Sequence, residues 1–425
     1  MSILNVNKIN PVGGGSTITI AGIASVTSSV TAPSFVGDVT GNVTGNADTA
    51  SGLSGNPSIN TTGIITATTL NYTGNQNLSH RNIIINGAMM VAQRGVTSNS
   101  TGYQTVDRIT TTTSGGIDNA CTYAQVDVSS GTTPYTNGFR KAFKITNGDQ
   151  SSIATNDYVY FTYNFESQDI ANSGWNYTST SSFITLSFWV KSSVAQEFHG
   201  YLKTNDGTAQ LYSFSTGSLI ADTWTKVTKT IPGNSNLQFD NNTDTGLLLR
   251  IAGYMGTYRT GSLTQNQWAA YNGSLRYPNF TNTWFDTNDA TLEFTGLQLE
   301  VGPVATPFEH RSFADELRRC QRYYIRLTRG GGNAMHFPGS TKQQQYVSCS
   351  RVELPTTMRT APSVSFTGTR DILNYSNDNS GFSGDIIDTD SFNIRWGSST
   401  TIGDGTGYTA ALTGNPNYIE CSAEL

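Results

Sequence analysis

Apolar and polar residues alternate over short runs through the middle of this chain, which is the pattern of half-buried β-strands. Turn clusters such as Asn205, Asp206 and Gly207 separate the runs. Strands are predicted over residues 82–86, 121–126, 140–146, 158–165, 184–191, 198–204, 225–231, 247–252 and 291–300. Many alternating strands with connections of Greek-key length predict a β-sandwich, so the fold class is mainly β with a jelly-roll domain.

One short helix is predicted after the last of these strands. Its apolar side chains share one helical face, and they are Phe313, Leu317, Cys320 and Tyr324. Ser312 is the predicted N-cap, with Asp315 and Glu316 in the first turn, where negative charge suits the helix dipole. Pro303 and Pro307 interrupt the preceding segment, so the chain is expected to cross from strand to helix without pairing.

Residues 1–80 contain repeats that alternate Ile or Val with Thr or Ser between glycines. Residues 18–26 align with 59–67, and 37–46 repeat a shorter unit. Such segments hold too few large side chains for a core of their own, so they are expected to form an elongated stalk by association of identical chains, three for a cyclic trimer. A flexible linker is the alternative that the same composition leaves open.

Three domains are predicted. Residues 1–80 are the N-terminal anchor and trimeric stalk, 81–328 the jelly-roll, and 329–425 a small C-terminal β domain that follows a run of glycines. A chain of 425 residues is too long for one ordinary β-domain, which agrees with this division.

Composition narrows the partners of the chain. The net charge is −5, so there is no basic footprint for DNA or RNA, and no nucleic-acid partner is expected. No long apolar run and no signal-peptide pattern occurs, so the chain is expected to be made in the cytoplasm without membrane insertion.

Metal binding and disulfides are not indicated. The cysteines, Cys121, Cys320, Cys349 and Cys421, are far apart and lack zinc-ligand spacing. Buried free thiols are favoured, while a Cys349–Cys421 disulfide stays open. Oxygen-bearing residues near Asp240 and Asp244 form no calcium loop, so no metal and no cofactor are expected.

Catalysis is not indicated either, and the chain is predicted not to be an enzyme. Cleavage of a glycan needs two cooperating carboxyl groups. Glu293 and Glu300 are odd and even positions of one predicted strand, so they are expected on opposite faces. The four histidines have unrelated surroundings, and no G-x-S-x-G sequence is present.

Aromatic residues are the candidates for sugar binding, because a pyranose ring stacks on Trp or Tyr. They lie without regular period among Gly, Asn and Thr, which predicts loops at one end of the sandwich: Tyr254, Tyr258, Trp268, Tyr271, Tyr277 and Trp284. Trp396 and Tyr408 belong to a second, weaker cluster in the C-terminal domain. Packing between protomers is the alternative role for these rings.

Several segments resemble bacteriophage tail-fibre and receptor-binding proteins, of the cyanophage-like type with a jelly-roll domain similar to carbohydrate-binding modules. The segments are LQLEVGPVATPFEHR at 297–311, ELRRCQRYY at 316–324, NIIINGAMMVAQR at 82–94, Val106-Asp107-Arg108, FITLSFWVKS at 183–192 and TWTKVTKTI at 223–231. In the first of these, the resemblance implies that Glu309, His310 and Arg311, together with Leu317 of the helix, hold the crossing against the sheet.

The resemblance implies a homotrimeric virion component of the tail that mediates adsorption to the host cell. Its expected partners are further copies of itself, a phage tail or adaptor protein bound through the N-terminal segment, and a host surface glycan or lipopolysaccharide. Two alternatives stay open: a tailspike enzyme that degrades surface polysaccharide, and a structural decoration protein that binds no receptor.

Overall fold

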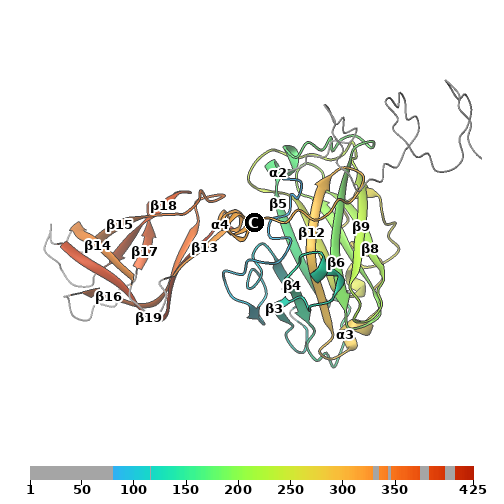
Figure 1. Ribbon diagram of the computed structural model, residues 1–425, viewed down its shortest axis with the longest axis horizontal. Helices are drawn as coiled ribbons and strands as arrows, with labels where there is room; N and C mark the ends of the chain where they lie inside the picture. Colours follow the sequence, from blue (N-terminus) through green and yellow to red (C-terminus); the bar gives the residue numbers. More distant parts are fainter. Residues whose placement is uncertain (1–79, 115, 329–334, 343–345, 374–381, 398–406) are drawn as a thin grey trace, which may run out of the picture. The chain divides into compact units, whose positions relative to one another are not determined.

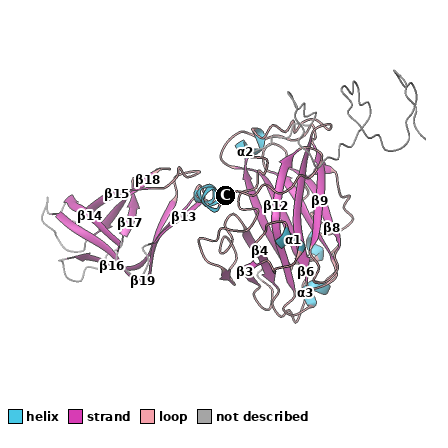
Figure 2. Ribbon diagram, in the orientation of Figure 1, coloured by secondary structure: helices cyan, strands magenta, loops and turns pink. Residues whose placement is uncertain are grey.

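The computed structural model describes residues 80–114, 116–328, 335–342, 346–373, 382–397 and 407–425. Strands make up most of the regular structure, as Figure 2 shows, and the predicted mainly β class is confirmed. Of the stalk predicted over residues 1–80, all but His80 lies outside the described residues. The predicted domain boundaries stay predictions.

Two antiparallel sheets form the sandwich (Figure 1). The order of the first sheet is β1 (Thr97–Ser98), β3 (Thr122–Asp127), β4 (Lys141–Thr146), β12 (Thr291–Val301), β6 (Phe183–Ser192) and β9 (Thr225–Pro232). The order of the second is β11 (Trp268–Ala270), β8 (Gln210–Ser218), β7 (Glu197–Thr204), β10 (Thr245–Met255), β5 (Tyr158–Glu166) and β2 (Thr110–Thr113). The order of strands is not sequential, as Greek-key connections require.

Aromatic rings join the two sheets. Phe161 of β5 meets Phe143 of β4 edge-on at 5.7 Å and Phe294 of β12 at 4.9 Å between ring centroids. All three are fully buried in one core cluster that both sheets supply. Since residues alternate along a strand, filling this core from one face of each strand leaves the opposite face free for other chemistry.

Eight of the predicted strands are confirmed to within a few residues, and one is wrong. Residues 82–86 form a turn rather than a strand, because asparagine side chains satisfy the backbone there. Asn82 Oδ1 accepts from Ile84 N at 3.0 Å, and Asn86, at φ 62°, donates to Val91 O at 2.9 Å. Strand β8, which was not predicted, lies between β7 and β11.

A β-bulge interrupts β12 and reverses its pattern of faces. The register shifts between Thr295 and Gln298, and Gly296 lies there at φ 65°. A Cβ on Gly296 would approach the Phe139 ring to 2.6 Å, so only glycine fits. The side chains packed in the core are Leu292, Phe294, Leu297 and Leu299. The expectation that Glu293 and Glu300 face opposite ways is therefore wrong, because the bulge places both on the outer face.

A third sheet contains β13 (Tyr324–Thr328), β14 (Met335–Lys342), β15 (Tyr346–Glu353), β16 (Ser363–Leu373), β17 (Phe382–Asp385), β18 (Ser391–Gly397) and β19 (Gly407–Ser422). It has its own core, which includes Ile325, Phe392 and Ile419. Cys421 is a buried free thiol in this core, so the disulfide to Cys349 is not formed.

The predicted helix is confirmed as α4 (Phe313–Gln321), and Ser312 caps it by accepting from Asp315 N at 3.2 Å. Its buried face differs from the prediction. Phe313 is 52% exposed and Leu317 is half-buried, whereas Glu316 and Cys320 are buried. The reason is polar: the Glu316 carboxylate accepts from the Asn86 backbone and lies 3.6 Å from Arg311, which turns that side of the helix inward. The other helices are short: α1 (Thr133–Thr136), α2 (Ser167–Ala171), α3 (Thr283–Asp286) and the 3₁₀ turn η2 (Thr257–Arg259).

The crossing before α4 is tied to the turn at 80–86. Glu309 accepts from Asn82 N at 2.7 Å and forms a salt bridge with Arg311 at 3.1 Å. Arg311 also donates to the carbonyls of Asn82 and Ile84, and His310 Nε2 lies 2.8 Å from Asn137 O. These bonds add to the two backbone bonds that the turn makes with β12, Ile83 N to Leu299 O and Leu297 N to Gly87 O, each 2.9 Å long.

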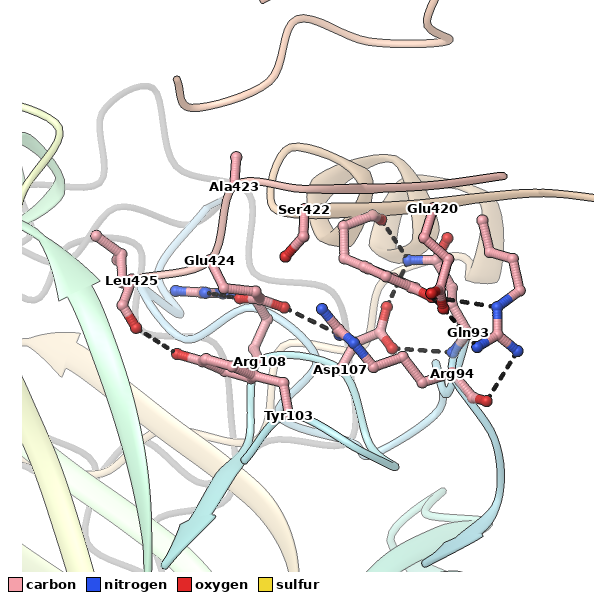
Figure 3. Close-up of polar contacts among 12 residues, drawn as sticks. Gln93, Arg94, Tyr103, Asp107, Arg108, Glu420, Ser422, Ala423, Glu424 and Leu425 are labelled. Atoms are coloured by element: carbon pink, nitrogen blue, oxygen red, sulfur yellow. Dashed lines mark hydrogen bonds and ion pairs between the residues drawn. The ribbon is translucent and has the colours of Figure 1, made fainter. Parts of the chain in front are cut away.

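A buried polar cluster holds the end of the chain, as Figure 3 shows. Glu424 forms salt bridges with Arg108 at 2.9 Å and Arg94 at 3.1 Å, and the Tyr103 hydroxyl donates to Leu425 O at 2.9 Å. The Arg108 guanidinium also lies 3.4 Å over the ring of Tyr323. Nearby, burial raises the pKa of Asp107 to about 6, although the hydrogen bonds from Gln93 lower it.

A second buried ion pair closes the end of β5. The Glu166 side chain is fully buried and accepts from Arg322 Nε at 2.7 Å, Arg322 Nη2 at 2.8 Å and the Tyr323 hydroxyl at 2.6 Å. These bonds lower the pKa of Glu166, although burial alone would raise it. The three bonds join the sandwich to the residues that begin β13.

We predict that Glu166→Gln lowers the free energy of unfolding by about 3 kcal/mol, because it leaves a partly buried guanidinium without its counter-charge. Urea unfolding at neutral pH measures this change in the free energy of unfolding. Asp127→Asn is the matched control: it removes an exposed carboxylate paired with Lys141 at 2.6 Å and should cost less than about 1 kcal/mol. Equal losses for the two variants would contradict the structural role given to Glu166.

Candidate functional site

The outer face of the second sheet carries tyrosine and basic side chains in place of the usual small polar ones. On β5 the inward residues are Val159 and Phe161, and the outward residues are Tyr158 and Tyr160, whose rings stack at 5.4 Å. The outward residues of β7 include Tyr201 and Lys203, and β10 contributes Arg250. The two-residue repeat of the strands therefore gathers these side chains on one face.

Arg250 lies at the centre of this face. In the register it is opposite Thr162 of β5 and Tyr201 of β7. Its Nε donates to Thr162 Oγ1 at 3.0 Å, and its guanidinium lies 4.1 Å over the Tyr160 ring and 5.6 Å over the Tyr201 ring. This stacking fixes the guanidinium plane. Among the described residues, neither Nη of Arg250 has a hydrogen-bond partner.

The segment between β11 and α3 adds two more side chains. The Lys203 ammonium lies 4.8 Å over the Tyr271 ring, and the Arg276 guanidinium lies 5.5 Å from the same ring. Tyr271 is held in place because its N–H donates to Ala209 O at 2.9 Å, next to β8. Lys203 also donates to Asn205 Oδ1 at 2.5 Å. We call Tyr160, Tyr201, Lys203, Arg250, Tyr271 and Arg276 the tyrosine–cation face.

The charges on this face are all positive. In the described part of the chain, no carboxylate forms a salt bridge with Lys203, Arg250 or Arg276. Burial lowers the pKa of Lys203, and the nearby charges of Arg250 and Arg276 lower it further. Burial raises the pKa of Tyr201, although Arg250 and Arg276 act against it. The face is thus a local source of positive potential.

The predicted candidate residues divide between the core and this face. Tyr254 points inward from β10, Trp268 lies on β11 and donates to Pro232 O at 2.7 Å, and Trp284 lies on α3 and is fully buried. Tyr277 is fully buried against Tyr201 at 5.0 Å. The expectation that Tyr254, Trp268 and Trp284 lie in loops is wrong, because their rings complete the core.

The remaining candidates keep access to solvent or lie outside the described side chains. Tyr258 is 61% exposed on η2, with Arg259 4.5 Å over its ring, and Tyr271 is half-buried on the tyrosine–cation face. Trp396 lies on β18 and Tyr408 on β19, and their side chains are outside what the structure describes. For these two residues the role stays a prediction.

Sequence reasoning missed Tyr160, Tyr201, Lys203, Arg250 and Arg276. The signal was present in the strands rather than in the loops. On the face that does not enter the core, YVYFTYNF at 158–165 presents Tyr158 and Tyr160 and then Thr162 and Asn164, while HGYLK at 199–203 presents His199, Tyr201 and Lys203. Large aromatic and basic residues thus occupy part of a face on which small polar residues are usual.

Two pockets lie away from the tyrosine–cation face. One of about 500 Å³ is lined by residues of both charges, among them Arg81, Asp169 and Arg322. A second of about 140 Å³ lies beside the bulge of β12 and includes Trp189 and Phe308. The first brings its charges together with opposite partners such as Glu166, and the second is small, so neither combines aromatic stacking with unpaired donors as the tyrosine–cation face does.

In the ranges that the structure describes, no group of three or more His, Cys, Asp or Glu residues is placed to hold a metal ion. No helix among the described residues is long and apolar enough to span a membrane.

No family model and no curated protein sequence matches this chain. Solved structures similar to it include a phage tailspike domain and several carbohydrate-binding modules. The enzymatically active domain of bacteriophage CBA120 tailspike protein 4 matches over 52% of this chain and 21% of that domain, at 8% identity and a TM-score of 0.27. The N-terminal cellulose-binding domain of Cellulomonas fimi β-1,4-glucanase C matches over 51% of this chain and 99% of its own length, at 10% identity and a TM-score of 0.25. A putative sugar-binding protein from Bacteroides thetaiotaomicron matches over 52% and 99%, at 12% identity and a TM-score of 0.26.

TM-scores of this size establish neither a shared fold nor a shared function. The β-sandwich is established by the strand order and core of this chain itself.

We predict that Arg250→Gln raises the pKa of Lys203, because it removes a neighbouring positive charge. Titration of the lysine ε-methylene signals by NMR measures the pKa. Arg318→Gln is the control, since Arg318 is exposed on α4, and it should leave the pKa of Lys203 unchanged. An unchanged pKa in Arg250→Gln would show that the two side chains do not share one face in solution.

Proposed function

We propose that this chain is a glycan-binding virion protein that attaches a phage to its host, and that the tyrosine–cation face contacts the glycan. One observation carries the proposal: stacked tyrosines and outward-facing donors lie together on one sheet face. The half-buried Tyr271 offers an apolar ring to sugar C–H groups, while Arg250, Lys203 and Arg276 offer N–H donors to oxygen atoms. Tyr160 and Tyr201 are buried, and their rings hold the Arg250 guanidinium in place. This combination is the one that sugar recognition requires.

The resemblance of residues 81–324 to phage tail-fibre proteins supports the wider role. In this role the chain is a homotrimer, the N-terminal segment binds a tail or adaptor protein, and the sandwich meets a surface glycan or lipopolysaccharide. A flat face gives a weak single site. Three copies on each fibre, with several fibres on each particle, raise the avidity without a tight single site.

Binding without cleavage is part of the proposal. Hydrolysis of a glycan needs an acid and a second carboxylate within about 5–10 Å. None of the residues that make up the tyrosine–cation face is a carboxylate. A tailspike enzyme and a non-receptor decoration protein are the competing functions. Release of reducing ends from host polysaccharide would mark the enzyme, and absence of any cell or glycan binding would mark the decoration protein.

We predict that Tyr271→Ala weakens binding to host cells or to a glycan array by about tenfold, because a stacked ring contributes about 1–2 kcal/mol at an exposed contact. The melting temperature should stay nearly unchanged, since Tyr271 is only half-buried.

Trp268→Ala is the contrasting variant. The Trp268 ring is buried and hydrogen-bonded, so the variant should lose about 3–5 kcal/mol of stability. Loss of binding in Trp268→Ala without loss of stability, together with full binding in Tyr271→Ala, would contradict the assignment of the site.

We also predict that the full chain is a trimer at micromolar concentration, because the repeats of residues 1–80 hold too few large apolar side chains for a core of their own. Light scattering measures the mass of the particle against the 45.8 kDa of one chain. A monomer mass for the full chain would contradict the proposed fibre.

A further inference from the structure

Among the described residues, no carboxylate forms an ion pair with the positive side chains of the tyrosine–cation face. The chain has 30 acidic and 25 basic residues, so acids are the more common partners available. Five arginines elsewhere each meet a glutamate, namely Arg94, Arg108, Arg311, Arg322 and Arg326, whereas Arg140 and Arg259 lie singly over tyrosine rings. Lys203, Arg250 and Arg276 meet tyrosine rings instead.

Like charges held together destabilise a fold by mutual repulsion, and partial burial increases the effect. Here two separate elements bring them together: the strands carry Lys203 and Arg250, and the segment after β11 carries Arg276. The position of this segment is fixed by backbone hydrogen bonds, since Arg276 N donates to Arg259 O at 2.9 Å. The repulsion is relieved when an anion binds between the cations.

The hydrogen-bonding groups of the tyrosine–cation face also favour an anion, because most of them are donors. A neutral sugar has hydroxyls that both donate and accept, and its sites commonly supply acceptors such as carboxylates alongside donors. The charged groups of the tyrosine–cation face, the guanidinium groups of Arg250 and Arg276 and the ammonium of Lys203, are donors only, and its side-chain acceptors are neutral tyrosine hydroxyls rather than carboxylates. Arg276 Nε is bonded to Gly273 O at 3.0 Å and Arg250 Nε to Thr162 Oγ1, which leaves the Nη atoms of both arginines for a ligand.

We propose that the ligand of this face is an anionic glycan, whose carboxylate, sulfate or phosphate groups bind Arg250, Arg276 and Lys203 while a sugar ring stacks on the half-buried Tyr271. The inference rests on the proposed function and adds the charge of the glycan to it. Stacking orients the Arg250 guanidinium before the ligand arrives, so two parallel N–H groups can meet one carboxylate or sulfate. Tyrosine rings beside the cations suit a chain of sugars rather than a small free anion.

The test is affinity electrophoresis of the full chain in gels that contain matched polymers. Dextran is compared with dextran sulfate, and methyl-esterified polygalacturonate with polygalacturonate, so that each pair differs in charge on one backbone. We expect retardation by at least one charged polymer, and much less by its neutral partner. Retardation by dextran sulfate would indicate recognition of sulfate, and retardation by polygalacturonate would indicate recognition of carboxylate. Raising the salt from about 0.05 M to about 0.5 M should weaken the retardation, because it shortens the range of charge interactions.

Three variants locate the effect. Arg250→Gln and Lys203→Gln should each weaken binding to the charged polymer by about tenfold, the effect of losing one hydrogen bond to a charged group. Lys226→Gln is the control, because Lys226 is an exposed lysine of β9 in the other sheet, and it should bind as the wild type does. Melting temperatures establish that each variant is folded. Lys203→Gln keeps the test valid if Arg250→Gln fails to fold.

Two results would overturn the inference and leave the proposed function standing: retardation by neutral polymers alone, or equal retardation of Arg250→Gln, Lys203→Gln and Lys226→Gln by the charged ones. Loss of charged-polymer binding in Lys226→Gln as large as in Lys203→Gln would show general attraction to basic side chains and would likewise overturn it. Retardation by no polymer of either kind would count against both the inference and the proposed function.

Discussion

The buried Glu166 carboxylate is the interaction on which the described structure depends most. It ends β5, a strand whose inner face supplies Phe161 and Phe165 to the core. Three of its four side-chain hydrogen bonds hold Arg322 and Tyr323, the residues between α4 and β13, and the fourth comes from Gln168 Nε2. A carboxylate with no exposure is stable only when its lone pairs are satisfied, so Arg322 and Tyr323 must occupy these positions for β5 to end where it does. The sandwich and the residues that follow it are therefore fixed by one charge.

Arg108 extends the same constraint to the end of the chain. Its guanidinium is covered by Tyr323, donates to Asn164 O at 2.6 Å and pairs with Glu424. Arg108 also has φ 72°, a conformation that costs energy for a residue with a Cβ and persists because these partners determine it. β5 is thus held at its end, on its inner face and beside Asn164. On the outward face of the strand, Tyr158 stacks on Tyr160, and Tyr160 meets Arg250.

The strands could be predicted from the sequence because the alternation of apolar and polar residues shows which side chains are buried. Burial in turn decides which residues of neighbouring strands pair. It failed where local side-chain chemistry overrides alternation. Asn82 and Asn86 convert an apolar run into a turn by bonding the backbone themselves. Gly296 inserts a bulge that places Glu293 and Glu300 on one face, and no periodicity reveals a bulge before its partner strand is known. On α4, Glu316 is buried because Asn86 and Arg311 lie opposite it, although a helical pattern counts it as polar and exposed.

The site was missed for a related reason. Tryptophan and tyrosine in an irregular segment suggest exposed loops, yet Trp268 and Trp284 fill the core and Tyr277 seals the segment against Tyr201. The largest rings lie in the core because each of them buries the most apolar area. What remains available for a ligand is what the core cannot use: tyrosines with a polar edge, and long basic side chains whose stems cover them while the charge stays at the surface. The proposed binding surface therefore combines Lys203 and Arg250 of two strands with Tyr271 and Arg276 of the segment after β11, and no single stretch of the sequence displays this combination.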